Sequence, residues 1–198
     1  MPQRHFPLFT TQVQLAHSYW ESLLSPGDCV LDLTCGNGHD TLFLANIVLK
    51  NQKGKIIAYD IQDQAIQQSK SRLKEILDAK SMQQISFYQK CHSLLPKKEE
   101  LPEVKLIVYN LGYLPGADKS QTTKTRSTLE SLDKATQLIS PAGAISIMCY
   151  PGHPEGKLEE SAIIEWAQKL NVQEWHCCHH QQINGNKAPS LMLIQKAT

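Results

Sequence analysis

Short apolar runs alternate with amphipathic stretches along most of the chain. Apolar runs rich in branched residues predict strands at 29–34, 55–60, 84–88, 104–110, 143–150, 173–180 and 189–195. Apolar residues at helical spacing predict helices at 11–24, 39–50, 62–79, 124–139 and 157–170. Strands joined by crossover helices are typical of an α/β fold with a mostly parallel sheet and helices on both faces. No helix separates the last two strands, so we expect them to pair as an antiparallel hairpin at the sheet edge.

Composition narrows this picture without pointing to a function. The chain has 198 residues, 41% of them hydrophobic and 20% charged, which suits a single domain over 1–198 with a helical extension at 1–25. The net charge of +1 means that a nucleic-acid partner would have to contact a local basic patch. No apolar run approaches the roughly 18 residues of a membrane span, and the first residues lack the apolar core of a signal peptide. Six scattered cysteines are typical of buried thiols in a reducing compartment, so we expect a cytoplasmic protein without a membrane partner.

The loop after the first predicted strand carries the first candidate chemistry. It runs from Asp32 through Gly36, Asn37 and Gly38 to Asp40, and its glycines allow a tight turn against a ligand. A dinucleotide fingerprint needs a third glycine, but Thr41 stands at that position. Because acids here would repel a pyrophosphate, Asp32 and Asp40 favour a ligand that carries an ammonium group.

A second acid extends this candidate site. Asp60 ends the second predicted strand, where a carboxylate can accept hydrogen bonds from both hydroxyls of a ribose. A glycine loop with these acids fits a nucleoside that bears an amino-acid tail, and S-adenosylmethionine is such a molecule. The alternative is a structural turn in which Asp32 and Asp60 act as caps. After the third strand, His92 and Ser93 are placed to contact the adenine, unless they belong to a surface loop with a helix cap at Ser93.

The loop after the fourth predicted strand carries the candidate catalytic residues. Its segment Asn110-Leu-Gly112-Tyr113 resembles the Asn-Pro-Pro-Tyr motif of amine-directed methyltransferases. In that motif the Asn oxygen and a following carbonyl accept hydrogens from the target amine, and the aromatic ring packs on the substrate. The alternative is a simple turn at a strand end. Further along, Lys119, Lys124 and Arg126 are candidates for phosphate contacts, or else form an ordinary solvated face.

Three other segments give weaker signals. Tyr150 could stack on a base and His153 could contact substrate or relay a proton, although a loop histidine without such a role is as plausible. The cluster Cys177–His180 suggests a metal site, but neighbouring strand residues point to opposite faces and the usual zinc spacing is missing, so we expect no metal. In the first helix, His17, Tyr19 and Trp20 are expected to pack against the sheet rather than to contact substrate.

Taken together, five segments resemble one family over nearly the whole chain. "LDLTCGNGHDTLFLA", "YDIQ", "YNLGYLPGADKS", "YPGHPEG" and "NKAPSL" are similar to the MnmM-type methyltransferases, a family long labelled rRNA methylases. The resemblance implies a Rossmann-like class I methyltransferase fold. The family positions for S-adenosylmethionine correspond to Asn37, Asp40, Asp60, Gln62, His92 and Ser93, and Ile61 is a further candidate contact with the cofactor. Its later motifs correspond to Asn110, Gly112, Tyr113, Asp118, Lys119, Tyr150 and His153, and Ala117 stands where the family often has glycine.

The resemblance also implies a reaction. Members of the family methylate the amine of 5-aminomethyl-2-thiouridine at the wobble position of tRNA to give 5-methylaminomethyl-2-thiouridine. The leading hypothesis is therefore a tRNA N-methyltransferase in which Asn110 and Tyr113 position the amine and Asp118 accepts its proton. The partner would be the anticodon stem-loop, and a homodimer would supply a larger basic surface than one small domain offers. The alternatives are methylation of rRNA, of a protein side chain or of a small amine, and a cofactor-binding module without activity.

Overall fold

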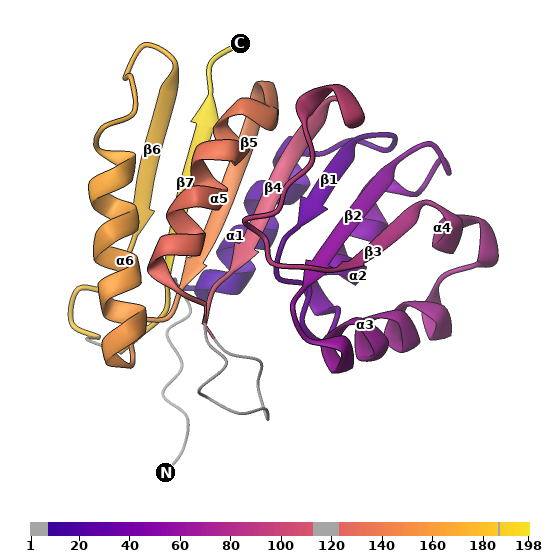
Figure 1. Ribbon diagram of the computed structural model, residues 1–198, viewed down its shortest axis with the longest axis horizontal. Helices are drawn as coiled ribbons and strands as arrows, with labels where there is room; N and C mark the ends of the chain where they lie inside the picture. The colour runs from indigo at the N-terminus through magenta and orange to yellow at the C-terminus, as the bar shows by residue number, and fades with distance from the viewer. Residues whose placement is uncertain (1–7, 113–122, 186) are drawn as a thin grey trace.

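A seven-stranded mixed sheet forms the centre of the computed structural model, which describes residues 8–112, 123–185 and 187–198 (Figure 1). The strands are β1 (Cys29–Asp32), β2 (Lys55–Asp60), β3 (Ile85–Gln89), β4 (Val104–Asn110), β5 (Ile139–Cys149), β6 (Trp175–His180) and β7 (Ser190–Lys196). Their spatial order is β3-β2-β1-β4-β5-β7-β6. The first five strands pair in parallel, whereas β7 is antiparallel to both β5 and β6. The predicted sheet and its terminal antiparallel hairpin are thus confirmed.

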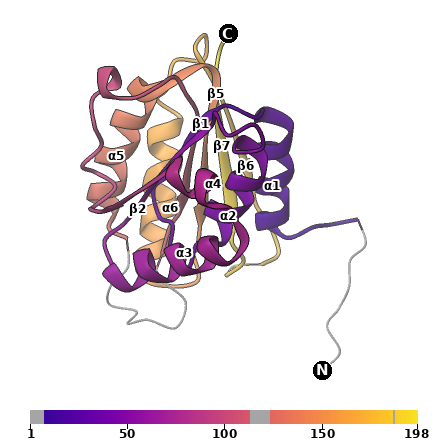
Figure 2. The same cartoon turned by 90° about the vertical axis from the view of Figure 1, so that its right-hand side faces the viewer.

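Helices cover both faces of the sheet, as the two views show (Figures 1 and 2). They are α1 (Gln12–Leu23), α2 (His39–Val48), α3 (Asp63–Ile76), α4 (Ala79–Gln83), α5 (Thr125–Leu138) and α6 (Pro154–Ala167), with a 3-10 turn at Lys98–Glu100. Ile107 and Tyr109 of β4 face the cluster packed by α5 and α6, whereas Leu106 and Val108 face the cluster packed by α1, α2 and α3. Because both faces of β4 are buried, its sequence is a continuous apolar run rather than an alternating one.

Three of the differences from the predicted element boundaries have identifiable local reasons. The predicted helix at 62–79 is interrupted where Leu77 takes an extended conformation and the Asp78 side chain accepts a hydrogen bond from Ser81 N at 2.7 Å, which starts α4. Strand β5 begins at Ile139 rather than 143, because Ser140 Oγ donates to Val104 O at 2.9 Å on the neighbouring strand. Helix α6 begins at Pro154, earlier than predicted, since proline is favoured in the first turn of a helix.

The parallel pairing brings the carboxyl ends of β1, β2, β4 and β5 to one edge of the sheet. Loops at this edge are the usual ligand-binding position in open α/β sheets, so the predicted site residues should meet here. In the described parts of the chain, none of the helices is both long enough and apolar enough to cross a membrane.

Candidate functional site

The glycine loop between β1 and α2 makes a tight left-handed turn. Gly36 and Gly38 have φ angles of +48° and +78°, which residues with a side chain rarely adopt. Gly38 also has no room for a side chain, because an added Cβ would lie 2.5 Å from Ser69 Oγ and 2.8 Å from Ser69 Cα of α3. Close packing of α3 against the loop therefore depends on Gly38, although the third glycine of a dinucleotide fingerprint is missing.

Replacing Gly38 with alanine should destabilise this loop. We expect the free energy of unfolding to fall by about 1–3 kcal/mol, because strain at positive φ adds to a steric clash with the α3 backbone. Urea denaturation followed by circular dichroism measures the change. Gly152→Ala is a matched control, since its added Cβ would meet no atom closer than Lys187 O at 3.5 Å. Equal stability of the two variants would contradict this account of Gly38.

Asp60 links the end of β2 to the glycine loop. Its carboxylate accepts hydrogen bonds from Gly36 N at 3.0 Å and from Gln62 N at 2.9 Å. Burial raises the pKa of Asp60, while these backbone donors oppose the shift. A carboxylate has about four acceptor positions, so it can still accept hydrogen bonds from hydroxyl donors such as those of a ribose. Next to it, Ile61 is 51% exposed and could cover one face of a flat ligand.

Asp32 is less accessible than the sequence suggested. It is 1% exposed, and its carboxylate accepts hydrogen bonds from Thr41 Oγ1 at 2.6 Å and from Thr34 N at 3.3 Å. Burial raises its pKa to about 7, and the nearby carboxylates of Asp40 and Asp60 act in the same direction. Asp32 therefore joins the loop to the first turn of α2. Of the two acids, Asp40 is the more exposed to solvent.

The raised pKa of Asp32 predicts a pH-dependent stability. Between about pH 4, where the unfolded carboxyl ionises, and about pH 7, where the folded one does, only the folded state keeps the proton. This contribution to stability is complete at acid pH and is lost as the pH rises to 7. We therefore expect Asp32→Asn to gain stability relative to the native chain between pH 5 and pH 7.5 in urea denaturation. A difference that does not change with pH would mean that folded Asp32 is already ionised at pH 5.

The loop after β3 brings His92 and Ser93 beside β4 and α5. His92 is 5% exposed, burial lowers its pKa to about 4, and its ring makes an edge contact with Tyr109 at 5.9 Å. Its Nδ1 is buried without a hydrogen-bond partner among the described residues. Ser131 Oγ donates to His92 O and Lys134 Nζ donates to Ser93 O, both at 2.7 Å, so α5 fixes this loop. A neutral imidazole with an unused nitrogen suits a polar, uncharged ligand group.

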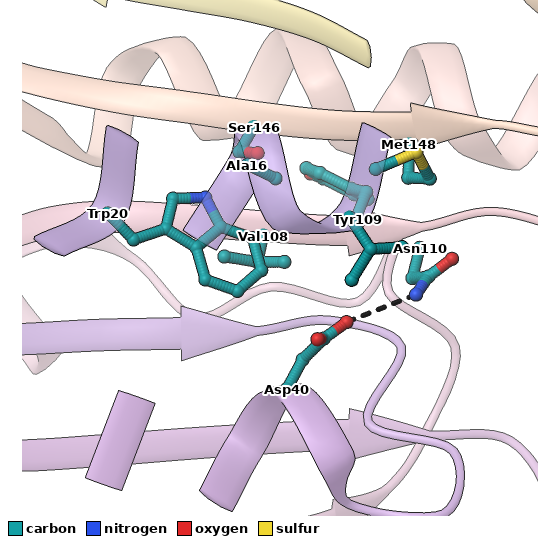
Figure 3. A pocket seen from close by; sticks show the side chains of 9 residues that line it. Ala16, Trp20, Asp40, Val108, Tyr109, Asn110, Ser146 and Met148 are labelled. Carbon is teal, nitrogen blue, oxygen red and sulfur yellow. Dashed lines mark hydrogen bonds between the residues drawn. The ribbon is translucent and has the colours of Figure 1, made fainter. Parts of the chain in front are cut away.

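Asn110 ends β4 and lies where the loops after β1, β4 and β5 meet. Its backbone N–H donates to Thr34 Oγ1 at 2.6 Å, and its side-chain Nδ2 donates to Asp40 Oδ2 at 3.1 Å (Figure 3). Burial raises the pKa of Tyr150 and the charge of Asp40 raises it further, while the neighbouring Asn110 side chain opposes the shift. The Tyr150 ring lies close to the open side of Gly112, 3.7 Å from where a Cβ would be. The structure thus brings together four of the predicted site residues, Asp40, Asn110, Gly112 and Tyr150.

Glu159, a buried acid on α6, stabilises the contact between Gly112 and Thr123, the described residues on either side of the loop after β4. Gly112 N donates to Thr123 Oγ1, and Thr123 N donates to Gly112 O, both at 3.0 Å. Glu159, only 3% exposed, accepts hydrogen bonds from Thr123 Oγ1 and Thr128 Oγ1 at 2.6 Å each. Tyr113, Asp118 and Lys119, three of the predicted site residues, lie outside the described residues.

Three other predicted site residues differ in exposure and in their contacts. Lys124 and Arg126 are exposed at the start of α5, on the same edge of the sheet as Asn110. His153 is the N-cap of α6, because its Nδ1 accepts a hydrogen bond from Gly156 N at 3.1 Å. This capping role leaves one ring nitrogen of His153 already engaged.

The histidines and cysteines of β6 are divided between its two faces. Cys178 Sγ lies 3.4 Å from His176 Nε2 on one face, while on the other Cys177 contacts Ala167 O and His179 lies 3.6 Å from Glu160. Within the described ranges, no group of three or more His, Cys, Asp or Glu side chains is arranged to hold a metal ion.

Sequence reasoning missed the part that His17 plays at this site. We expected the histidine only to pack, and it does stack on Phe43 with ring centroids 3.8 Å apart. It also bonds Asp40, with its Nε2 2.8 Å from Asp40 Oδ1. Thr34 and Glu159 were missed as well, since no local motif marks them. The available signal was a polar residue at helical spacing from apolar ones, namely His17 near Trp20 and Glu159 near Ile163.

Comparison with known proteins connects this geometry to a family. A family model described as "Putative rRNA methylase" matches residues 56–196. A relative from Arabidopsis thaliana, "tRNA (mnm(5)s(2)U34)-methyltransferase, chloroplastic", is 36% identical over 189 residues, or 92% of this chain and 68% of the relative.

Solved structures agree over almost the full chain. A "putative rRNA-methylase" from Clostridium thermocellum is 29% identical with a TM-score of 0.87, covering 95% of this chain and 98% of that chain. A "putative methyltransferase" from Streptococcus mutans, solved in complex with SAH, is 25% identical with a TM-score of 0.80, covering 95% and 99%. These matches confirm the Rossmann-like methyltransferase fold that the sequence predicted.

Proposed function

The chain belongs to the rRNA methylase family, and on this premise we propose that it methylates the amine of 5-aminomethyl-2-thiouridine at the wobble position of tRNA. The methyl donor is S-adenosylmethionine, in agreement with the SAH complex of the Streptococcus mutans relative. The product would be 5-methylaminomethyl-2-thiouridine. The name of the Arabidopsis relative supports this substrate, and the geometry around Asn110 supports transfer to nitrogen.

The orientation of the Asn110 amide is the observation that carries the proposal. Because Nδ2 donates to the Asp40 carboxylate, the amide oxygen points away from Asp40 (Figure 3). A carbonyl oxygen held in this way can accept a hydrogen from an amine and so direct the nitrogen lone pair. It also stabilises the positive charge that develops on the nitrogen during transfer.

The described residues fit the methyl donor on chemical grounds. The left-handed turn at Gly36 and Gly38 leaves the backbone open to a close ligand, and Asp60 has acceptor positions for a ribose. Further contacts are proposed for Asn37, Gln62, His92 and Ser93, of which Asn37 Oδ1 and His92 Nδ1 are buried without a partner among the described residues. When bound, S-adenosylmethionine supplies an electrophilic methyl group and departs as S-adenosylhomocysteine.

The residues of this chain would then prepare the acceptor. A primary amine is mostly protonated near neutral pH, so it must lose a proton before its lone pair can attack. We assign the acceptance of that proton to Asp118 and packing on the nucleoside to Tyr113, on the sequence resemblance alone. Tyr150 lies beside the same Asn110 side chain, in the loop after β5, and we assign its ring to stacking on a base.

The tRNA would be held by the edge of the sheet around Asn110. Lys124 and Arg126 are exposed at the start of α5 and could contact phosphates of an anticodon stem-loop, together with Lys119. These two cations, at the N-cap and in the first turn of α5, are repelled by the positive end of the helix dipole, and an anionic partner would offset that repulsion.

The test is methyl transfer to tRNA that lacks the modification. The protein is incubated with labelled S-adenosylmethionine and tRNA from a strain without the native enzyme, and the digested nucleosides are analysed by mass spectrometry. We expect one methyl group to be added to 5-aminomethyl-2-thiouridine. Ribosomal RNA and total protein from the same strain serve as parallel acceptors. Labelling of either of these, with none in tRNA, would reject the proposed substrate.

A further inference from the structure

His17 on α1 belongs to a hydrogen-bonded chain that ends at the candidate catalytic amide. His17 Nε2 lies 2.8 Å from Asp40 Oδ1, and the other oxygen of the same carboxylate accepts from Asn110 Nδ2 at 3.1 Å. The three residues come from α1, α2 and the end of β4, and 23 and 70 residues of sequence separate the bonded pairs. The chain therefore exists only in the folded protein.

The direction of each hydrogen bond follows from the chemistry of the partners. A carboxylate can only accept, so His17 Nε2 must carry the hydrogen, and the nitrogen of the Asn110 amide must face Asp40. With its NH₂ group turned toward Asp40, Asn110 presents its oxygen on the other side. In the reverse orientation, the amide N–H groups would face the N–H groups of the acceptor amine. The amide oxygen would then face the Asp40 carboxylate, and two acceptors would repel each other.

Packing fixes the first member of the chain. The imidazole of His17 stacks on Phe43 of α2 with centroids 3.8 Å apart and planes 16° apart, and it lies 4.9 Å from the ring of Trp20. These contacts leave the ring little freedom to turn. The carboxylate of Asp40 is 15% exposed, so loss of its partner would not be fully replaced by water.

We propose that His17 is a positioning residue for methyl transfer: it orients the Asp40 carboxylate, which in turn fixes the Asn110 amide with its oxygen toward the acceptor amine. This inference rests on the proposed function for its reaction, but the hydrogen-bonded chain itself can be tested without it. Helix α1 is thus part of the acceptor site, and not only a cover for the sheet.

The test compares two substitutions at one position. His17→Phe keeps the ring stacked on Phe43 and removes the N–H, whereas His17→Gln can place an amide N–H near the same point. For His17→Phe we expect kcat to fall about tenfold with KM for tRNA nearly unchanged, because the orientation of the acceptor, rather than its binding, is lost. For His17→Gln we expect kcat within about threefold of the native value. Tyr19 lies on the same helix as His17, and Tyr19→Phe, which removes a 3.2 Å contact with His180 of β6, should leave kcat unchanged.

A second measurement separates failure of this inference from failure of the proposed substrate. In ¹⁵N-labelled protein without tRNA, the side-chain amide protons of Asn110, assigned by their loss in Asn110→Ala, should exchange faster with solvent in His17→Phe than in His17→Gln. His17→Leu replaces His17→Phe if that variant does not fold. Equal exchange in the two variants, or a kcat that Gln does not restore, would overturn the positioning role. If the Asn110 amide protons exchange slowly in the native protein but no methyl group is transferred to tRNA, the proposed substrate is overturned instead.

Discussion

Asn110→Ala is expected to reduce kcat for methyl transfer by about 10²-fold while the affinity for S-adenosylmethionine stays close to the native value. The alanine removes the oxygen that would accept a hydrogen from the amine, and with it an electrostatic contact that strengthens in the transition state. The methyl donor would be held mainly by the glycine loop and Asp60, which the substitution does not touch. Steady-state transfer to unmodified tRNA gives kcat, and calorimetry with S-adenosylmethionine in the absence of tRNA gives the affinity.

Two comparisons make this result specific. Asn46→Ala changes the same residue type at an exposed position of α2 and should retain full activity. Asn110→Ala also leaves one Asp40 oxygen without its amide donor, so thermal unfolding should accompany the kinetics to exclude a fold effect. A variant with native kcat would remove Asn110 from the mechanism, and a parallel loss of cofactor affinity would assign it to the donor side.

The hydrophobic pattern predicted the order and type of the elements because each buried strand is visible in the sequence as an apolar run. In β4 every residue from Leu106 to Tyr109 is buried, and the run needs no distant contact to be recognised as a central strand. The break between α3 and α4 was missed, since helical spacing continues through Leu77 and the interruption depends on the Asp78 cap. The early start of β5 was missed for a different reason: it depends on the contact of Ser140 with β4, which lies 36 residues away.

The candidate site was predictable where its residues are close together in the sequence and form a recognisable motif. The loop through Gly36 and Gly38 and the Asn110 segment are local motifs, and parallel pairing places both at one edge of the sheet. The hydrogen bonds between them were not predictable. Thr34 reaches Asn110 over 76 residues, and nothing near either residue marks the other.

The two acids of the glycine loop show the same limit. Asp32 and Asp40 looked equivalent in the sequence, because both flank the turn and both could meet an ammonium group. Burial separates them, since Asp32 is enclosed and bonded to Thr41 while Asp40 connects α1 to Asn110. Charge type is visible in a sequence, but whether a charged group faces water or the core depends on the packing of other elements.

Asp60→Ala should have the opposite kinetic signature to Asn110→Ala. We expect the dissociation constant for S-adenosylhomocysteine to rise by about 10²-fold, because hydrogen bonds to a charged acceptor contribute about 1.5–3 kcal/mol each. The loop itself would loosen as well, since Asp60 holds Gly36 N and Gln62 N. At saturating cofactor, kcat should recover to within a few-fold of native, because the substitution removes binding that the ground state and the transition state share.

Calorimetry and a titration of S-adenosylmethionine in the transfer assay measure these two quantities. The matched control is Asp63→Ala, which removes an exposed carboxylate three positions later, in the first turn of α3. If Asp60→Ala bound the cofactor as tightly as Asp63→Ala does, the ribose contact would be wrong and the hydrogen bonds of Asp60 to the loop would be purely structural. If kcat stayed low at saturation, the loop that Asp60 holds would also position the acceptor, through the bond between Thr34 and Asn110.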